Sequence, residues 1–197
     1  KNTDVVCPVT IRDVGGSGYY YVGIIKTGTG KYTFTSTKSI TTASLGVQVY
    51  QGTFLVDIPV TDNTTALGRC SQANVLTISA NAIGGGNGRL TGKVQVDSLG
   101  TLVIGNNDIG QLVLADTLSG KVASPLVLDK NGKIEFKLRS AQSYDRISTS
   151  STATLNNGTL LLKPATGVSI SDGDRFTILS ANKAVEADTF KLVAQGF

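Results

Sequence analysis

Two phrases of this chain, about a hundred positions apart, carry nearly the same pattern of side chains. VQVYQGTFLVD (47–57) and ATLNNGTLLLK (153–163) place apolar residues at every second position, pass through a glycine, and resume the alternation; VQVDSLGTLVIG (94–105) is a looser copy. A period of two is typical of a β-strand with one buried face. The glycine supplies a corner, so the same face stays inward on both sides of it.

The composition favours strands and turns over helices. The 197 residues include 23 glycines and only two glutamates, Glu135 and Glu186, and charged residues make up 16% of the chain. No segment keeps a period near 3.6 residues, which an amphipathic helix would require. We therefore expect an all-β protein whose short strands are separated by turns rich in Gly, Asn, Asp and Ser.

Two architectures bury such strands, a parallel β-helix (solenoid) and a β-sandwich of hairpins. Asn-Gly hairpin signals are few, at 87–88, 131–132 and 157–158. Single-glycine corners and a recurring phrase favour a right-handed parallel β-helix, with the β-sandwich as the alternative. At about 20–25 residues per coil, the chain would form about eight or nine coils. The regular strands begin at Ile24, so we predict an N-terminal cap or linker at 1–23 and a β-solenoid at 24–197.

The segment IIKTGTGKYTFTSTKSITTASLGVQVYQGTFLVD (24–57) resembles the autotransporter-associated β-strand repeat, through its KTGTG phrase, its alternating strands and its closing VQVYQGTFLV. The segment 144–190 resembles the C-terminal end of autotransporter passenger β-helices, in the order YDRI, ATLNNGTLLL, GDRFTILSA and DTF. This resemblance implies a secreted or surface-displayed bacterial β-helix with an adhesive or structural role.

Cys7 and Cys70 are the only cysteines, and the chain has no histidine. A metal site would need further ligands, and a reactive thiol would usually have a histidine base nearby. We therefore predict a Cys7–Cys70 disulfide, which indicates an oxidising compartment. The chain begins with Lys and contains no Met, so we expect an extracellular or cell-surface product from which a signal peptide has been removed. No apolar run is long enough to cross a bilayer.

The sequence offers no catalytic signature. The absence of histidine removes Ser-His-Asp, Cys-His and His-metal arrangements. The acidic residues are mostly isolated, and the Asp residues at 129, 172 and 174 are typical of Asx turns. We expect the opposite charges of Asp145-Arg146 and Asp174-Arg175 to pair across coils. Gly84–Gly88 lacks the Lys-Ser/Thr of a phosphate loop and is predicted to be a mobile loop. We predict no catalytic residue, cofactor or metal.

Basic residues do not cluster as they do in nucleic-acid-binding proteins. The densest group alternates with apolar residues, which indicates a solvated sheet face and predicts no nucleic-acid partner; it consists of Lys130, Lys133, Lys137 and Arg139.

Together these patterns predict a non-enzymatic structural or adhesive solenoid that self-associates into a fibre or surface layer, or binds a host or cell-surface glycan or protein. Open terminal coils carry unpaired backbone groups that accept further strands. The candidate contact surfaces are the run Tyr19, Tyr20 and Tyr21 at one end and the tail FKLVAQGF, with Phe190 and Phe197, at the other. The alternative is a carbohydrate-binding module or polysaccharide-active β-helix, with Tyr19–Tyr21, Tyr32 and Tyr50 as its aromatic platform.

Overall fold

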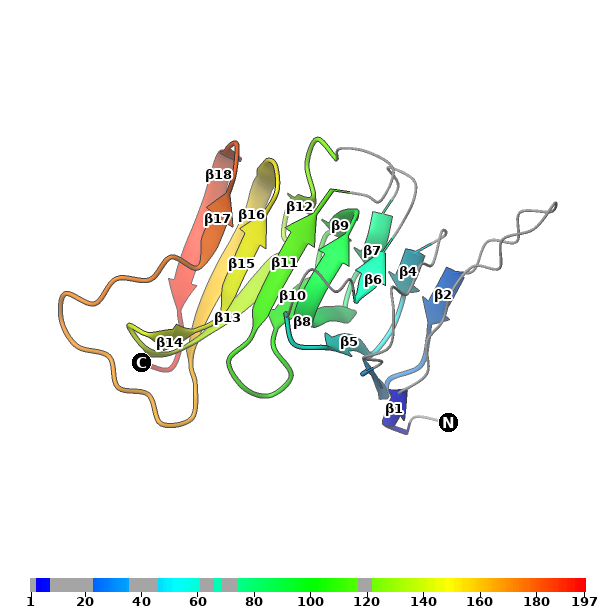
Figure 1. The fold of residues 1–197 in the computed structure, drawn as a ribbon, viewed down its shortest axis with the longest axis horizontal. Helices are drawn as coiled ribbons and strands as arrows, with labels where there is room; N and C mark the ends of the chain where they lie inside the picture. Colours follow the sequence, from blue (N-terminus) through cyan, green and yellow to red (C-terminus); the bar gives the residue numbers. More distant parts are fainter. Residues whose placement is uncertain (1–2, 8–22, 36–45, 61–65, 69–73, 117–121) are drawn as a thin grey trace.

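The chain forms an elongated stack of β-strands, with its two termini at opposite ends of the stack (Figure 1). The computed structural model describes residues 3–7, 23–35, 46–60, 66–68, 74–116 and 122–197, and these contain eighteen strands and no helix. Nearly all strand pairs are parallel, and most strands in the middle of the stack pair with strands of the coils before and after them. The predicted parallel β-helix is therefore confirmed, and the β-sandwich alternative is wrong.

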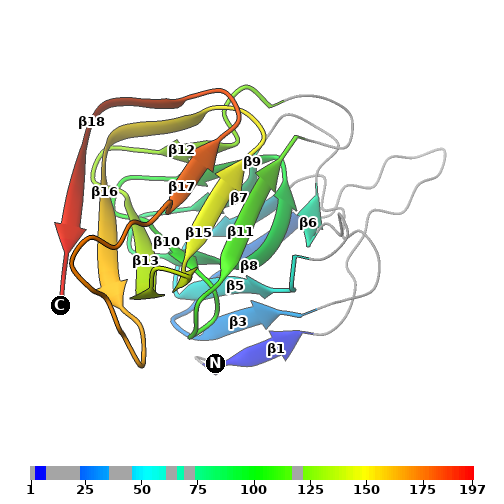
Figure 2. The ribbon, with the colours of Figure 1, turned by 60° about the vertical axis from the view of Figure 1, so that its left-hand side comes forward.

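Three parallel ladders form the sides of the stack (Figure 2), and we call them faces A, B and C. Face A contains β2 (Gly23–Lys26), β4 (Gly46–Val49), β7 (Asn74–Ile78), β9 (Lys93–Val96), β12 (Leu126–Leu128) and the first parts of β16 (Ala153–Pro164) and β18 (Val185–Ala194). Face B contains β1 (Val5–Cys7), β3 (Lys31–Phe34), β5 (Thr53–Asp57), the first part of β8 (Ile83–Thr91), β10 (Thr101–Ile104), β13 (Lys133–Ser140) and the second parts of β16 and β18.

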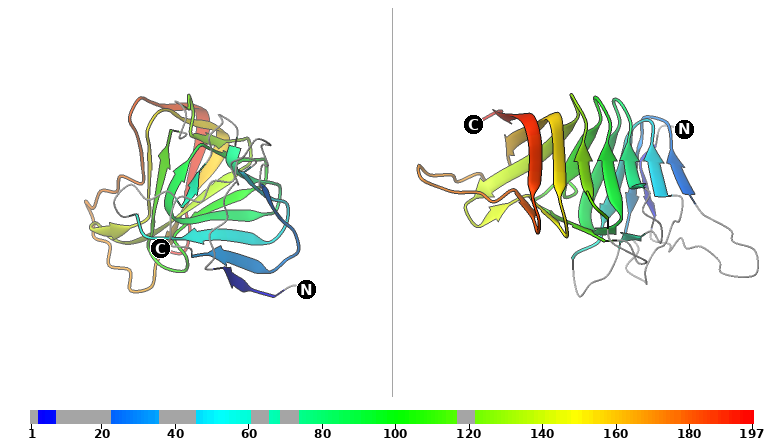
Figure 3. Two further views of the ribbon diagram at one scale, coloured as in Figure 1. Left: turned by 45° about the vertical axis from the view of Figure 1, so that its right-hand side comes forward. Right: turned by 90° about the horizontal axis from the view of Figure 1, so that it is seen from above.

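Face C contains β6 (Leu67–Gly68), the second part of β8, β11 (Gln111–Ala115), β15 (Arg146–Thr149) and β17 (Leu179–Ala181). The short strand β14 (Ser143–Tyr144) pairs antiparallel with β13 and forms a hairpin at the edge of the stack. Seen from above, the coils follow one another along the axis in sequence order (Figure 3).

The core is a continuous apolar column inside the three faces. Phe34, Phe54 and Phe136 are fully buried, as are the inward residues of successive strands in face A, such as Leu76 and Val94. The inward residues predicted in the repeated phrases are confirmed: Val47, Val49, Phe54, Val56, Ala153, Leu155 and Leu160 are buried, and Leu162 is half-buried. The alternation of the sequence is therefore the alternation between core and solvent.

The corners of the repeated phrases use left-handed conformations, but only one of them does so at the predicted glycine. Gly52 has φ 71°, whereas in the other two phrases the residue before the glycine has the positive φ, Leu99 at 65° and Asn157 at 54°; Asn131 turns in the same way at 64°. An Asn tolerates this conformation better than most residues with a Cβ, because its short amide bonds to nearby backbone. The predicted even coil of 20–25 residues is wrong, however. Leu76 and its partner Val94 are 18 positions apart in the sequence, whereas Val94 and its partner Leu126 are 32 positions apart. The coil length varies because residues outside the ladders lengthen some coils, while the inward side chains keep the ladders in register.

The prediction of a mobile loop at Gly84–Gly88 is wrong. These residues belong to β8, which passes from face B to face C, and its four glycines are buried. Gly85, Gly86 and Gly88 have φ 130°, 112° and 141°, values that L-residues rarely adopt. A Cβ on Gly86 would lie 1.9 Å from the Val56 carbonyl oxygen of β5, and one on Gly85 would lie 2.1 Å from the Val103 carbonyl oxygen of β10. The glycines are therefore required by close strand packing.

Candidate functional site at the two ends of the stack

The C-terminal end of the stack is an open coil. β18 pairs with β16 and, among the described residues, with no further strand, and it is exposed along its whole length. Leu192 continues the inward row of Ile134 and Leu160, but it is 60% exposed while those residues are buried. Phe190 and Phe197, predicted as contact residues, are also exposed at this end. The end therefore presents apolar side chains beside an unpaired strand edge.

The N-terminal end carries a second open edge, formed by β1 and β2 (Figure 3). In the described part of the chain, β1 pairs only with β3, and β2 pairs only with β4. Val5 and Val6 of β1 are 45% and 67% exposed. β1 lies in the segment predicted as a cap or linker, and its three residues are too few to show the alternation that predicts a strand. The predicted tyrosine run Tyr19–Tyr21 lies outside the described residues.

Lys26 distinguishes the β2 edge from the β1 edge. It occupies an inward row, beside the fully buried Val49, where the other coils have apolar residues. Its Nζ donates hydrogen bonds to the backbone oxygens of Thr27, Gly28 and Gln51 at 3.0, 2.6 and 3.1 Å. Burial lowers the pKa of this ammonium. An inward charge on an edge strand opposes further strand addition, so β1 is the more receptive edge.

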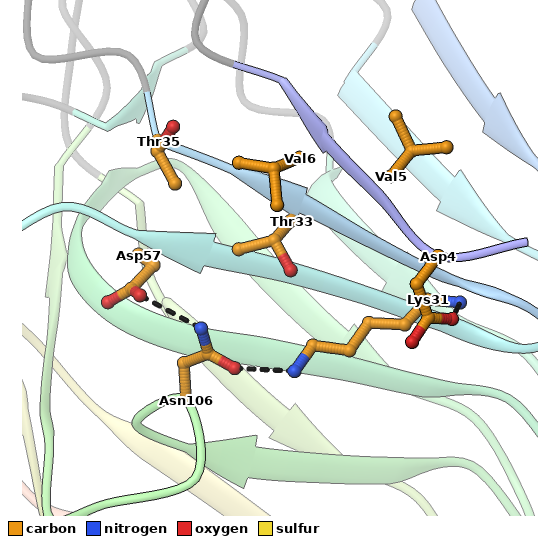
Figure 4. Close-up of a pocket in the computed structure, with 8 residues that line it drawn as sticks. All are labelled: Asp4, Val5, Val6, Lys31, Thr33, Thr35, Asp57 and Asn106. Carbon is orange, nitrogen blue, oxygen red and sulfur yellow. Dashed lines mark hydrogen bonds between the residues drawn. The ribbon is translucent and has the colours of Figure 1, made fainter.

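A cavity of about 400 Å³ borders β1 on the outer side of face B (Figure 4). The amide of Asn106 bridges two strands there: its Oδ1 accepts from Lys31 Nζ at 2.7 Å, and its Nδ2 donates to Asp57 Oδ2 at 2.9 Å. Asp4 accepts a hydrogen bond from the Lys31 backbone N–H at 2.8 Å. The charged side chains at this site are hydrogen-bonded to neutral groups of the chain, so the network holds the first strands in place.

Asn106 belongs to the loop 105–110, and a buried ion pair anchors that loop. Asp145 is fully buried; its carboxylate lies 2.9 Å from Lys137 Nζ and accepts the backbone N–H groups of Gly110 and Lys137, each at 2.7 Å. Burial raises the pKa of Asp145, and the Lys137 ammonium opposes that rise. The expected pairing across coils is therefore wrong for this aspartate, because its ion-pair partner lies in the same hairpin. Arg146 instead lies 5.6 Å from the centre of the Tyr144 ring.

A second cavity of about 340 Å³ lies at the corner between faces A and B near the C-terminal end. It combines one aromatic ring, two ammonium groups and two amides, and its lining is Lys130, Asn131, Asn157, Thr189, Phe190 and Lys191. The left-handed corners at Asn131 and Asn157 place these amides in successive coils. The Asn-Gly pairs at 131–132 and 157–158 were hairpin signals in the sequence, whereas in the structure they form corners between parallel strands.

The tyrosines of the predicted sugar platform do not gather on one face in the described structure. Tyr32 is half-buried and stacks on Phe54, with ring centres 5.6 Å apart. Burial, together with a hydrogen bond to Cys7, raises the pKa of Tyr32 to about 12. Tyr50 is exposed on another coil, and its hydroxyl bonds to Gln48 at 2.6 Å. Tyr32 therefore serves packing.

Cys7 is half-buried at the end of β1, and it is the cysteine that the structure describes. Its predicted partner Cys70 lies outside the described residues, so the disulfide stays a prediction. Within the described ranges, no three His, Cys, Asp or Glu side chains come together to hold a metal ion. Asp174 accepts the Ser171 backbone N–H at 2.9 Å. This donor lies three residues before Asp174, whereas an Asx turn bonds to backbone two residues after the Asp, so the predicted Asx turn is wrong for this contact.

The three parallel ladders around one apolar column define the class of this protein, a parallel β-solenoid. No protein-family model matches the sequence, and no curated protein is significantly similar to it. The resemblance to autotransporter passengers therefore stays a prediction. The described part of the chain contains no helix with the length and apolar character that crossing a membrane requires.

Proposed function

We propose that this protein is a non-enzymatic structural or adhesive solenoid, secreted or displayed on a cell surface, that assembles through its ends into a fibre or surface layer. The observation that carries the proposal is the exposed inward row of β18. Leu192 and Val185 stand 60% and 47% exposed in rows that are buried in the preceding coils. The extracellular location rests on the predicted Cys7–Cys70 disulfide and on the autotransporter resemblance.

Burial of this row supplies the driving force for assembly. Fully burying a Leu or Val side chain contributes about 1.5–3 kcal/mol, and β18 presents two such side chains at inward positions, Leu192 and Val185. Its unpaired backbone N–H and C=O groups would gain partners in an added strand. Solvent-exposed edges of this kind are usually blunted by inward charges or by proline, and β18 has neither at its inward positions 185, 187, 192 and 194.

We expect purified protein to form oligomers whose mass rises with concentration, and Leu192→Glu to keep the chain monomeric. The charge would have to be buried at the junction, and that burial is strongly unfavourable. Size-exclusion chromatography with light scattering measures the mass. Val168→Glu is the matched control, because Val168 is a similarly exposed apolar residue in the segment between β16 and β17. A monomeric wild-type protein at high concentration would contradict the proposal.

A second candidate function, binding of an acidic glycan, is favoured by the cavity around Phe190. Sugar rings stack on exposed aromatic faces, and the ammonium groups of Lys130 and Lys191 suit carboxylate or sulfate substituents. The amides of Asn131 and Asn157 offer donors and acceptors for hydroxyl groups.

Phe190→Ala is expected to abolish retardation of the protein by an acidic polysaccharide in affinity electrophoresis. A neutral polysaccharide should retard both the wild type and Phe190→Ala only weakly, because Lys130 and Lys191 would have no anionic group to bind. Phe197→Ala serves as the control, because Phe197 is exposed but does not line this cavity. Equal migration of wild type and Phe190→Ala in the acidic gel would exclude the glycan site.

A further inference from the structure

The two ends of the solenoid belong to the same ladder. The inward row that begins at Val5 continues through Tyr32, Phe54, Gly84, Leu102, Ile134, Leu160 and Leu192. The neighbouring outward row begins at Val6 and ends at Val193 by the same pairings. A second copy stacked on the C-terminal end in the same register would therefore add its β1 to the second part of β18.

Resting on the proposed end-to-end assembly, we infer that the junction is a parallel pair of β18 with β1 of a second copy of this chain, with Leu192 beside Val5. This register sets Val193 beside Val6 and Ala194 beside Cys7. Asp4, one residue before Val5, then meets Lys191, one residue before Leu192. The junction thus matches two exposed apolar pairs and one pair of opposite charges.

Other registers lose this match. A shift by one residue turns the inward side chains of one strand toward solvent. A shift by two in one direction places Val6 beside Lys191, and in the other it places Asp4 beside Val193, so a charge faces an apolar side chain in both cases. Complementary charges fix register and exclude wrong pairings, and here they select the continuation of the ladder.

The stepped shape of the N-terminal end selects β1 over β2. β2 and β3 are consecutive strands of one coil, joined by the corner at 27–30, whereas β1 pairs on the far side of β3. β1 therefore stands one layer beyond β2 and reaches the second copy first. The inward Lys26 of β2 also opposes strand addition at that edge.

A cysteine scan tests the register. In a Cys70→Ser background, Ala194→Cys would lie beside Cys7 of the next copy, at the strand spacing that a disulfide spans. Mild oxidation should give a ladder of linked dimers, trimers and larger species on a non-reducing gel. Val193→Cys is the control. Its side chain points to the opposite side of the strand from Cys7, so the series of disulfide-linked species should be absent from the gel.

A charge exchange gives a readout that needs no cysteine substitution. Lys191→Glu alone and Asp4→Lys alone should each raise the concentration for half-assembly by about fivefold, because like charges would meet across the junction. The chain with both changes should assemble better than either single variant, because opposite charges meet again across the junction, although it lacks the hydrogen bond that Asp4 accepts from the Lys31 N–H. If the protein assembles but shows neither the Cys7-linked species on the gel nor rescue in the double variant, this register is wrong and the proposed function still stands. A protein that never assembles overturns both.

Discussion

Replacing Gly86 with alanine is expected to lower the free energy of unfolding by about 4 kcal/mol or more. The added Cβ would lie 1.9 Å from the Val56 carbonyl oxygen and 2.8 Å from the Val56 nitrogen, and both atoms are backbone of the paired strand β5. No rotamer change relieves such a contact, so β5 and β8 must separate. The loss would be a large part of the roughly 5–15 kcal/mol that stabilises a typical domain.

Gly167→Ala separates this steric effect from backbone strain. Gly167 also has a positive φ, 73°, but a Cβ there would meet nothing within 4 Å. Its loss should be only about 1–2 kcal/mol, the strain of the left-handed conformation itself. Urea unfolding followed by far-ultraviolet circular dichroism measures both variants. Equal losses would show that strand packing does not require Gly86.

Lys137→Met is expected to lower the free energy of unfolding at neutral pH by about 3–5 kcal/mol, because it leaves a buried carboxylate without its cation. The Asp145 side chain is fully buried, and Lys137 Nζ lies 2.9 Å from it. Lys163→Met is the matched control. Its partner Glu135 is at 2.8 Å, but both side chains are partly exposed, so that loss should be about 0–1 kcal/mol.

The free energy of unfolding of Lys137→Met should depend on pH, and the raised pKa of Asp145 sets the direction of that dependence. Burial raises the folded-state pKa of Asp145 above the ordinary carboxyl value, and removing Lys137 removes the charge that opposes this rise. A carboxyl with a raised folded-state pKa stabilises the fold at low pH, and that contribution is lost as pH rises through the folded-state pKa.

The variant should therefore regain stability in mild acid, as measured by urea unfolding at a series of pH values. The double variant Lys137→Met with Asp145→Asn should show little of this dependence. A Lys137→Met protein that loses stability equally at all pH values would contradict the role of Asp145.

Much of the architecture was predictable because it depends on local chemistry. The repeated phrases show their inward residues through alternation, and Gly52 marks a corner where φ is positive. Phe190 and Phe197, predicted as contact residues, are exposed in the structure, and their contact role stays a prediction.

Other features could not be predicted from local pattern. GGGNG (84–88) has the composition of a loop, and only the approach of β5 and β10 makes it a buried strand. The pairing of Asp145 with Lys137 depends on the β13–β14 hairpin, which has only two paired positions and little sequence signal. Asn106, Lys31 and Asp57 lie far apart in the chain and meet because the loop 105–110 crosses the outer side of face B.

By itself, the sequence determined that the chain is all-β, which side chains face inward and where the backbone turns, since alternation and left-handed corners are properties of neighbouring residues. The tertiary structure alone decided the register between coils, and with it the burial of Gly86 and Asp145 and the correspondence between β1 and β18. Most of those features arise from contacts between residues 18 or more positions apart, where loop length hides the pairing and packing of the core selects it. The Asp145–Lys137 pair spans only 8 positions, but it depends on the β13–β14 hairpin.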